Sequence, residues 1–582
     1  MKKLLKLSAY AMAAVLVFTG CDDESTAEPA DEFVSVFATD NSASQGFRGE
    51  TVTLEFNVRS SSPITAASVN GNPVQVSDGA DQNITYDFTI PTDDEVGTNY
   101  DFTLSITNAE GTTTEESSVE LAAGPALPES GIRPLVTVFD AFSSIEVEAL
   151  ISTTDDIDTY TTDGGFQLGG SADGAGMVLN EETGNFELLV NCEDHYSVAR
   201  ITLDENLRPL KGDYMLNSSV SDFARQCSGT MWESAIHGGA NDLFISSSES
   251  FNYISRGIDP YQAVPTPSAE QHIRSFGQFS WENNVPLPQN AFAGQTVVIG
   301  GDDDSSDSEG QIALYYSDQG DADLENGSIY VLKRVGATAI ETEADLDFGV
   351  EYDVEFVEIP NGASLSKDEM EQASKDALSL QFMRVEDLDY GKGSDAANRI
   401  MYFAVTGRGP GRGTYNDWGT GYKLELNENN PLRGKLTQIV SGNTAGFNKG
   451  DGNMELLQSP DNICVTENYI YWQEDPNSFD RGHQAYIWQT NLDGENATEV
   501  LQIDLEESLN PLGRTFSGEF GAMFDVSEKI GEEGTFILSL QPHYWVDLDF
   551  AGIDGHDLGI PPGFPGEDVQ GSQLVILRNV PR

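Results

Sequence analysis

The chain has 582 residues and a formal net charge of −66, from 30 Lys and Arg against 96 Asp and Glu. A chain with this much negative charge repels nucleic acid and anionic membrane surfaces through its long-range electrostatic field. We therefore expect neither of them to be an electrostatic partner. The same excess of carboxylate favours the capture of divalent cations. A site for an anionic substrate would therefore need metals or arginine to make it locally positive.

The N-terminus carries an export signal. A basic start, Met1–Lys6, leads into an apolar run and then into Thr19-Gly-Cys21. This pattern predicts a lipoprotein signal peptide over residues 1–20 and lipid attachment at Cys21, which would anchor the chain in the outer-membrane lipid. The acidic, proline-bearing stretch 21–33 predicts a flexible tether. Its acidic start resembles the surface-export signal of Bacteroidota lipoproteins, although a solvated tether would look the same, and we expect an outer-membrane lipoprotein exposed at the cell surface.

Residues 34–122 alternate apolar and polar side chains, as in Val52–Val58, Ile84–Ile90 and Phe102–Ile106. Strands at this spacing in about ninety residues predict an Ig-like β-sandwich. The stretch contains no catalytic constellation, so we interpret it as a spacer or adhesion module. Residues 123–131, rich in Ala, Gly and Pro, are the predicted linker.

Residues 132–582 show many short apolar strands between Gly- and Asp-rich turns, for example Ile312–Tyr316, Met401–Val405 and Phe536–Leu540. This pattern favours a large β-propeller, which makes the chain an all-β protein with short helical insertions. One insertion begins at the capping box formed by Ser366 and Glu369 and is expected to end near Leu378.

Short acidic motifs punctuate this region in a fixed order: Phe279-Ser-Trp-Glu282, Gly301-Asp-Asp-Asp304, Arg384-Val-Glu-Asp387, Pro460-Asp-Asn462, Gln473-Glu-Asp475, Glu519-Phe-Gly521 and Gln541-Pro-His543. Carboxylates at strand ends supply the oxygen ligands that hard cations prefer. Arg384 and Glu386 would point to the same face of an extended strand, where the guanidinium fork suits a phosphate. The motifs therefore predict metal-assisted phosphoester chemistry.

The order and wording of the motifs resemble the PhoX alkaline phosphatases, exported bacterial enzymes built on a β-propeller that holds ferric iron and calcium. The resemblance covers roughly residues 130–582. It implies that Arg384 clamps the substrate phosphate, and that Glu282 and Glu386 are catalytic metal ligands. It also implies a wider set of metal ligands. Glu249 would lie beside the iron, and calcium would draw on several loops, which supply Asp302, Asp303, Asp461, Glu474, Asp475 and Glu519.

The chain departs from the family at the ligands for iron. A family cysteine near Glu249 is replaced by Ser247 or Ser248, and a hydroxyl is a poorer iron ligand than a thiolate. Either Cys192 donates instead, or the site uses calcium alone. Cys227 lies in a run that resembles a family motif, and we expect a structural role for it. The cysteines that remain after Cys21, namely Cys192, Cys227 and Cys464, would form one disulfide and one free thiol or three buried thiols.

The favoured function is hydrolysis of phosphate monoesters, with small organic phosphate esters as substrates. One alternative is a calcium-stabilised propeller that has lost catalysis and serves as a surface binding or adhesion lipoprotein. A weaker alternative is a calcium-dependent esterase or lactonase, since bound calcium can polarise a carbonyl group. The sequence has no Gly-x-Ser-x-Gly elbow and no His-x-x-x-His pair, which argues against a serine esterase and a zinc hydrolase.

Overall fold

The structure is a computed structural model. It describes residues 35–38, 45–46, 51–60, 62–77, 81–91, 98–109, 111–121, 132–159, 165–221, 224–249, 254–262, 272–304, 310–320, 322–409, 416–442, 453–476, 480–504, 506–510, 518–556 and 568–582. The predicted signal peptide, tether, lipidated Cys21 and linker lie outside these residues. The chain divides into two compact units, residues 1–125 and 126–582, and the division falls within the predicted linker. Among the described helices, none is both long enough and apolar enough to cross a membrane.

The first unit contains two sheets that share one apolar core. One sheet has the order β1 (Ser35–Ala38), β3 (Thr51–Arg59), β6 (Asp81–Thr89), and the other has the order β2 (Gln45–Gly46), β8 (Thr112–Leu121), β7 (Asn99–Thr107), β4 (Ala66–Val69), β5 (Asn72–Val74). Alternate side chains of β3 and β7, including Leu54, Phe56 and Leu104, are buried in that core. Burial on one face follows from the period-two alternation seen in the sequence. The unit is a β-sandwich, and its Ig-like character stays a prediction.

The second unit is a β-propeller whose described strands form six blades. The first three blades are β13 (Ala172–Leu179), β14 (Phe186–Cys192), β15 (Ser197–Leu203), β16 (Pro209–Leu216); β17 (Gln226–Trp232), β18 (Leu243–Ser248), β19 (Arg256–Ile258); and β20 (Trp281–Pro286), β21 (Thr296–Asp302), β22 (Ile312–Ser317), β23 (Ser328–Arg334). β11 (Ile157–Thr159) and β12 (Gly165–Phe166) extend the outer edge of the first blade.

The other three blades are β27 (Val385–Tyr390), β28 (Ile400–Val405), β29 (Thr420–Asn427), β30 (Asn430–Ser441); β31 (Pro460–Val465), β32 (Tyr469–Glu474), β33 (Tyr486–Asn491), β34 (Thr498–Ile503); and β35 (Glu519–Asp525), β36 (Phe536–Gln541), β37 (Gln573–Arg578). Two early strands complete the last two blades, because β9 (Val136–Val138) pairs with β34 and β10 (Glu146–Ser152) pairs with β37. β25 (Glu351–Glu358) pairs with both β23 and β30 and so joins the third and fourth blades.

The innermost strands form a closed ring. β13, β17, β20, β27, β31 and β35 each pack against the next, and β35 packs against β13. The apolar cores lie between neighbouring blades; Ile487 and Leu501 of the fifth blade, for example, share a core with Phe536 and Leu577 of the sixth. The predicted all-β propeller is therefore confirmed, and six strand ends meet around a common axis.

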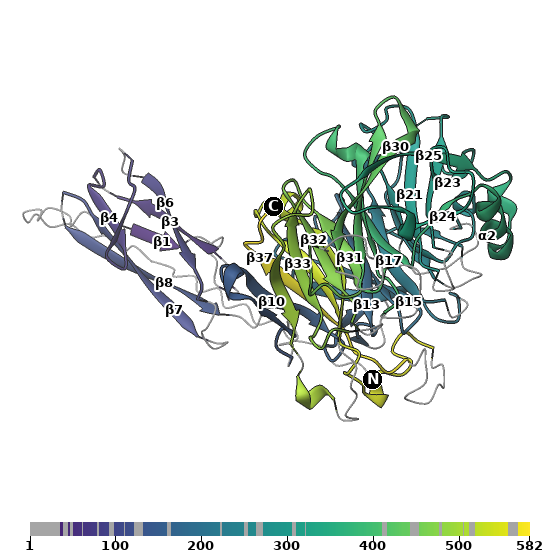
Figure 1. The fold of residues 1–582 in the computed structure, drawn as a ribbon. Coiled ribbons are helices and arrows are strands. Elements are labelled where there is room, and N and C mark those ends of the chain that lie inside the picture. Colours follow the sequence, from purple (N-terminus) through teal and green to yellow (C-terminus); the bar gives the residue numbers. More distant parts are fainter. Residues whose placement is uncertain are drawn as a thin grey trace, which may run out of the picture. The chain divides into compact units, whose positions relative to one another are not determined.

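The predicted helical insertion is also present. α2 (Lys367–Asp376) begins at the capping box of Ser366 and Glu369 and lies at the periphery of the unit (Figure 1). The Lys367 ammonium is buried and donates to Asp304 at 2.8 Å, so the first turn of the helix is tied to the loop after β21. β24 (Glu341–Thr342) pairs with β26 (Leu380–Gln381) beside it, and two one-turn helices, α1 (Ser234–His237) and α3 (Ser527–Ile530), follow innermost strands.

Candidate metal centre

Each of the six innermost strands contains a β-bulge close to its start. The register with the second strand of the blade shifts by one residue between Ala172 and Ala175, Gln226 and Gly229, Trp281 and Asn284, Val385 and Leu388, Pro460 and Ile463, and Phe520 and Met523. A bulge sets two consecutive residues opposite one partner and re-aims their side chains. The same β-bulge is therefore repeated in all six blades, at one end of the ring of innermost strands.

The bulges carry the residues with metal-ligating chemistry. Their paired residues are Asp173-Gly174, Cys227-Ser228, Glu282-Asn283, Glu386-Asp387, Asp461-Asn462 and Gly521-Ala522. In five blades the first residue is an acid or a thiol. The sixth blade has Gly521 at this position, and its acid is Glu519, two residues earlier. Four of the acidic motifs of the sequence, those with Glu282, Glu386, Asp461 and Glu519, thus lie at the starts of innermost strands around one axis.

The second bulge residues link the blades to one another. Ser228 donates its hydroxyl to the Asn462 side-chain oxygen at 2.9 Å, and Asn462 Nδ2 donates to Asp173 Oδ1 at 3.1 Å. Asn283 Nδ2 donates to Asp387 Oδ1 at 2.6 Å. Hydrogen bonds between buried side chains of different blades fix the ring of first residues in place.

A second layer of acids comes from the ends of the second strands. Because these strands run antiparallel to the innermost ones, they end where the innermost strands begin. Glu193, Glu249, Asp303 and Asp475 each follow directly after β14, β18, β21 and β32, and His543 lies just after β36. We call the combined set the acidic centre; it consists of Asp173, Glu193, Glu249, Glu282, Asp303, Glu386, Asp461, Asp475 and Glu519 with Cys227 and His543.

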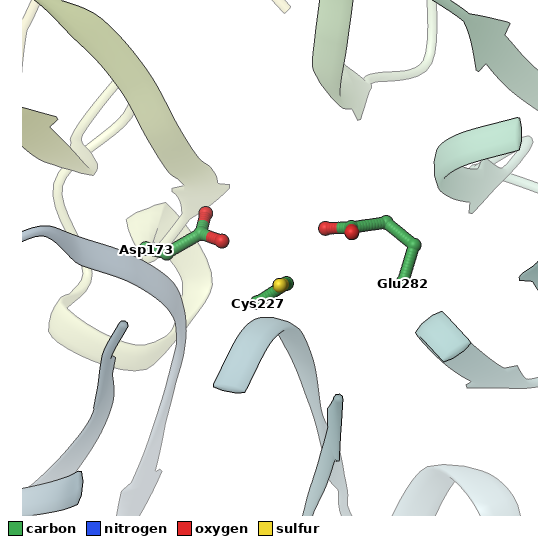
Figure 2. A group of neighbouring side chains, drawn as sticks. All are labelled: Asp173, Cys227 and Glu282. Carbon is green, nitrogen blue, oxygen red and sulfur yellow. The ribbon is translucent and has the colours of Figure 1, made fainter. Parts of the chain in front are cut away.

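Three groups within the acidic centre bring ligand atoms within 4.8 Å of one another: Asp173, Cys227 and Glu282; Asp475, Glu519 and His543; and Glu249, Glu282, Asp303 and Glu386. Figure 2 shows the carboxylates of Asp173 and Glu282 pointing toward each other, with the sulfur of Cys227 close by. Glu282 belongs to two of the groups. One of its carboxylate oxygens accepts a hydrogen bond from the Ser228 N–H at 3.0 Å.

Most of the acids predicted from the sequence converge here, and two do not. Asp461 is buried beside Glu386 and Glu282 without joining one of the three groups. Asp302 and Glu474 are the last residues of β21 and β32, and their oxygens accept hydrogen bonds from the protein itself. Asp302 accepts from the Ser280 N–H at 2.8 Å, and Glu474 accepts from the Trp488 indole at 2.7 Å and from the Tyr486 N–H at 2.9 Å.

Glu474 and the acidic centre should therefore respond differently to mutation. We expect Glu474→Ala to destabilise the fold by about 3 kcal/mol, because it leaves buried N–H groups without acceptors. Bound metal should stay unchanged, because the Glu474 oxygens are directed at protein donors. Thermal unfolding and metal analysis of the same preparation test this, and metal loss with unchanged stability would make Glu474 a ligand after all.

The structure adds residues that the motifs did not single out, among them Asp173, Glu193 and Arg225. It also places the Cys227 thiol at the centre, where the sequence predicts only a structural role. A sequence signal for this role of Cys227 does exist. It is a candidate ligand followed by a small polar residue at a strand start, as in Cys227-Ser228, Glu282-Asn283 and Asp461-Asn462. The three cysteines are buried thiols without disulfides. Cys192 joins none of the three groups, and burial raises its pKa to about 12.

Arg384 and Arg225 are the cations that face the acidic centre. Arg384 Nε donates to Asp303 Oδ1 at 2.9 Å, and its Nη2 lies 2.8 Å from Glu386 Oε1. Arg225 donates to Glu193 at 2.6 Å and to Asp194 at 3.1 Å. Burial and the charge of Asp303 raise the pKa of Glu249, and both guanidinium groups act in the opposite direction.

The convergence of Arg384 and Glu386 has a different origin from the one that the sequence predicts. β27 begins only at Val385, and Arg384 has φ of 65°, in the left-handed region that costs a non-glycine residue about 1 kcal/mol or more. The Thr406 N–H holds this conformation by donating to the Arg384 carbonyl at 3.1 Å. A strained residue and the following bulge, rather than strand alternation, direct the two side chains together.

Burial raises the pKa of the carboxyl groups at the centre, and neighbouring carboxylates raise it further. The pKa values of Asp173, Glu282, Glu386, Asp461 and Glu519 lie well above their usual range, and that of Glu249 rises to about 8. Without further cations, some of these groups must hold protons, because unpaired buried charges are costly. Glu386 Oε1 has no hydrogen bond to any described residue, although the Arg384 guanidinium lies close to it.

These residues fit bound metal ions. Carboxylate oxygens converging from several loops match the six to eight oxygen ligands of calcium. The group of Asp173, Cys227 and Glu282 adds a thiol, which favours a transition metal such as iron over calcium. The excess of buried carboxylate over guanidinium, with Glu386 Oε1 facing only the Arg384 guanidinium among the described residues, calls for additional positive charge at this place.

The pH dependence of stability should report the occupancy of the centre. With the metal removed, carboxyls whose folded pKa is raised bind protons more tightly in the folded state, so their stabilising contribution is complete below about pH 4.5 and is lost as pH rises through about 8. Each such group contributes a slope of up to about 1.4 kcal/mol per pH unit. We expect chelated protein to unfold at lower denaturant concentration at pH 8 than at pH 5.5. Protein reloaded with calcium should lose most of this difference, and equal pH dependence in both forms would contradict metal binding at the centre.

Comparisons with known proteins add little to this picture. The sequence matches no protein-family profile and no curated protein. Among solved structures, a quinonprotein alcohol dehydrogenase-like protein from Bacteroides thetaiotaomicron is 13% identical over 81% of this chain and 99% of that chain, with a TM-score of 0.26. An endo-fucoidan hydrolase of glycoside hydrolase family 107 is 10% identical over 80% of this chain and 43% of that chain, with a TM-score of 0.13. At TM-scores this low, neither likeness identifies a function for this chain.

Proposed function

We propose that the propeller unit is a metal-dependent phosphatase that hydrolyses phosphate monoesters at the acidic centre. The observation that carries the proposal is the placement of two arginines against a buried cluster of carboxylates. Arg384 pairs with Asp303 and Glu386, and Arg225 pairs with Glu193 and Asp194. Both arginines are partly accessible, with 15% and 36% of their side chains exposed. Paired guanidinium forks beside carboxylate ligands suit a dianionic phosphate.

The carboxylates and the thiol of the three groups would hold the metal ions, with Glu282 shared between two of them. Metal bound there would supply neutralisation of the phosphate charge and a lowered pKa for attacking water. The chain's own residues bind and orient the ester. When Asp303 and Glu386 act as ligands, the Arg384 N–H groups that now face them become available to phosphate oxygens. The hydrogen-bonded bulge residues keep the ligands in register, so little reorganisation accompanies substrate binding.

The test is metal analysis of the full chain together with hydrolysis of p-nitrophenyl phosphate before and after chelation. We expect bound calcium or iron, turnover that chelation abolishes, and recovery when the metal is restored. A phosphodiester and a simple lactone should be assayed beside the monoester. Lactone turnover alone would favour the calcium-dependent esterase, whereas bound calcium with no turnover of any ester would favour the surface binding protein and contradict the phosphatase.

A further inference from the structure

The group of Asp475, Glu519 and His543 brings the imidazole of the acidic centre beside two carboxylates. All three residues are buried, and their ligand atoms lie within 4.8 Å of one another. They come from the fifth and sixth blades, where Asp475 follows β32, Glu519 begins β35 and His543 lies just after β36. Because the three residues are far apart in the sequence, no short metal-binding motif marks them. What the group can bind depends on which ring nitrogen of His543 carries the proton.

Asp194 fixes this proton through Gln570. The buried Asp194 carboxylate accepts hydrogen bonds from Arg225 at 3.1 Å and from the Ser171 hydroxyl at 2.5 Å. It also accepts from Gln570 Nε2. Since a carboxylate beside an arginine is an acceptor only, the Gln570 amide must present its NH2 group to Asp194 and its oxygen to His543. Gln570 Oε1 lies 3.0 Å from His543 Nδ1, so Nδ1 is the nitrogen that carries the proton.

The other ring nitrogen of a neutral His543 then presents a lone pair to a carboxylate. His543 Nε2 lies 3.0 Å from Glu519 Oε2, and Glu519 Oε1 is engaged because it accepts from Gln541 Nε2 at 3.0 Å. A nitrogen lone pair and an ionised carboxylate oxygen repel each other at this distance, so either a proton or a metal ion must lie between them. Two atoms with this separation can both lie about 2.1 Å from one zinc ion.

The surroundings of the pair favour the metal ion over the proton. With a proton on Nε2, one imidazolium faces the carboxylates of Asp475 and Glu519, and the buried group of three keeps an excess negative charge. A divalent ion balances both carboxylates while the imidazole stays neutral. The second ring nitrogen also fits, because metal-bound histidines almost always donate their other ring N–H to a polar partner, as His543 does to Gln570.

The kind of metal follows from the nitrogen ligand. Imidazole suits zinc, iron and copper, whereas calcium and magnesium take oxygen ligands. We propose that Asp475, Glu519 and His543 bind a divalent transition metal ion such as zinc in preference to calcium, and that Gln570 is a positioning residue that presents His543 Nε2 to this ion. The inference rests on the proposed function only in requiring metal at the acidic centre, and it does not require hydrolysis of any ester. Calcium would then belong to the oxygen-only group of Glu249, Glu282, Asp303 and Glu386.

The test is zinc binding to the full chain in the presence of excess calcium, with both metals counted after dialysis. The calcium fills the oxygen-only group, so that zinc reports the sites that contain nitrogen or sulfur. The variants are His543→Gln, which removes the ring nitrogen, and Gln570→Met, which keeps the length of the side chain but removes the acceptor of the Nδ1 proton. His483→Gln is the matched control, because His483 Nδ1 also lies near a buried glutamate, 3.8 Å from Glu474 Oε2, but outside the acidic centre.

We expect the wild-type protein to hold one zinc ion per chain more than His543→Gln, because the group that contains Cys227 can take zinc equally in both. In Gln570→Met the affinity for this ion should fall about ten- to a hundredfold, which is the typical effect of removing the hydrogen-bond partner of a metal-bound histidine. Calcium content should stay unchanged in both variants, whereas a merely structural role of either residue would lower both metals. His483→Gln should match the wild-type protein.

Circular dichroism checks that each variant is folded, and if one is not, the other decides. Equal zinc content and affinity in the wild-type protein and His543→Gln would overturn the proposal, since a proton would then lie between His543 and Glu519. Loss of calcium together with zinc in Gln570→Met would overturn the positioning role. Ester hydrolysis by calcium-loaded protein that takes up no zinc would overturn this inference and leave the phosphatase standing, whereas zinc uptake at this group without turnover of any ester would do the reverse.

Discussion

Replacing Glu282 with Gln should abolish the activity of the acidic centre while leaving the propeller folded. Glu282 is the residue shared by the group that contains Cys227 and the group that contains Glu386, so one substitution weakens both. An amide keeps the size of the side chain and one oxygen but removes the negative charge that a cation requires. We expect these two groups to lose their metal. Phosphomonoester turnover should fall about a thousandfold or more, because the metal that stabilises the charge of the transition state is lost.

Glu371→Gln is the matched control for this substitution. Glu371 is also a buried glutamate with a raised pKa, of about 9, but it lies on α2 beside Lys367 and outside the three ligand groups. The amide keeps the size of this side chain away from the ligand groups, so the substitution should leave metal content and turnover unchanged. Metal analysis and p-nitrophenyl phosphate hydrolysis are measured on both variants. Equal effects of the two substitutions, or full activity of Glu282→Gln, would show that Glu282 is not a ligand.

The sequence predicts much of this centre because the acids follow the strand pattern. Glu282, Glu386, Asp461 and Glu519 each begin or interrupt an innermost strand, and a propeller brings all such strands to one axis. Once the fold is known to be a propeller, the convergence of these acids follows from the arrangement of its innermost strands around one axis. The predicted positions on the chain and the positions in space agree for this reason.

Asp302 and Glu474 show where the same reasoning ends. Each directly precedes an acid of the centre, Asp303 and Asp475, and sequence patterning cannot decide which of two adjacent acids faces inward. The structure decides it by hydrogen bonding, because Gln311 and Ser280 occupy the oxygens of Asp302 while Asp303 meets Arg384. Period-two alternation holds along a strand, but both pairs sit at a strand end, where no such constraint applies.

Cys227 was missed for a related reason. Its neighbours in the sequence carry no acid, and a thiol in an apolar strand is usually a small buried residue. The bulge, which strand alternation does not predict, turns Cys227 toward Asp173 of the first blade and Glu282 of the third. The repeat of one bulge per blade explains how residues with no common motif become equivalent ligands.

Replacing Arg384 with Lys should separate substrate binding from metal binding. Lysine keeps the positive charge between Asp303 and Glu386 but loses the planar fork that donates two N–H groups to one phosphate. We expect metal content to differ from the wild-type value by no more than about a fifth. The kcat/KM for p-nitrophenyl phosphate should fall about a hundredfold, which corresponds to the loss of roughly one pair of charge-assisted hydrogen bonds. Arg225→Lys should act in the same direction with a smaller effect, because the guanidinium is more exposed and therefore better screened.

Arg334→Lys is the matched control, since Arg334 makes an ion pair with Glu341 away from the acidic centre. It should leave both measurements unchanged. Competitive inhibition by inorganic phosphate gives a second readout, because the inhibition constant should rise in Arg384→Lys in step with the loss of kcat/KM if the arginine contacts the phosphate itself. Loss of metal together with activity would instead mean that Arg384 serves the ligands, by balancing the charge of Asp303 and Glu386, and the phosphate contact would then have to come from elsewhere in the centre.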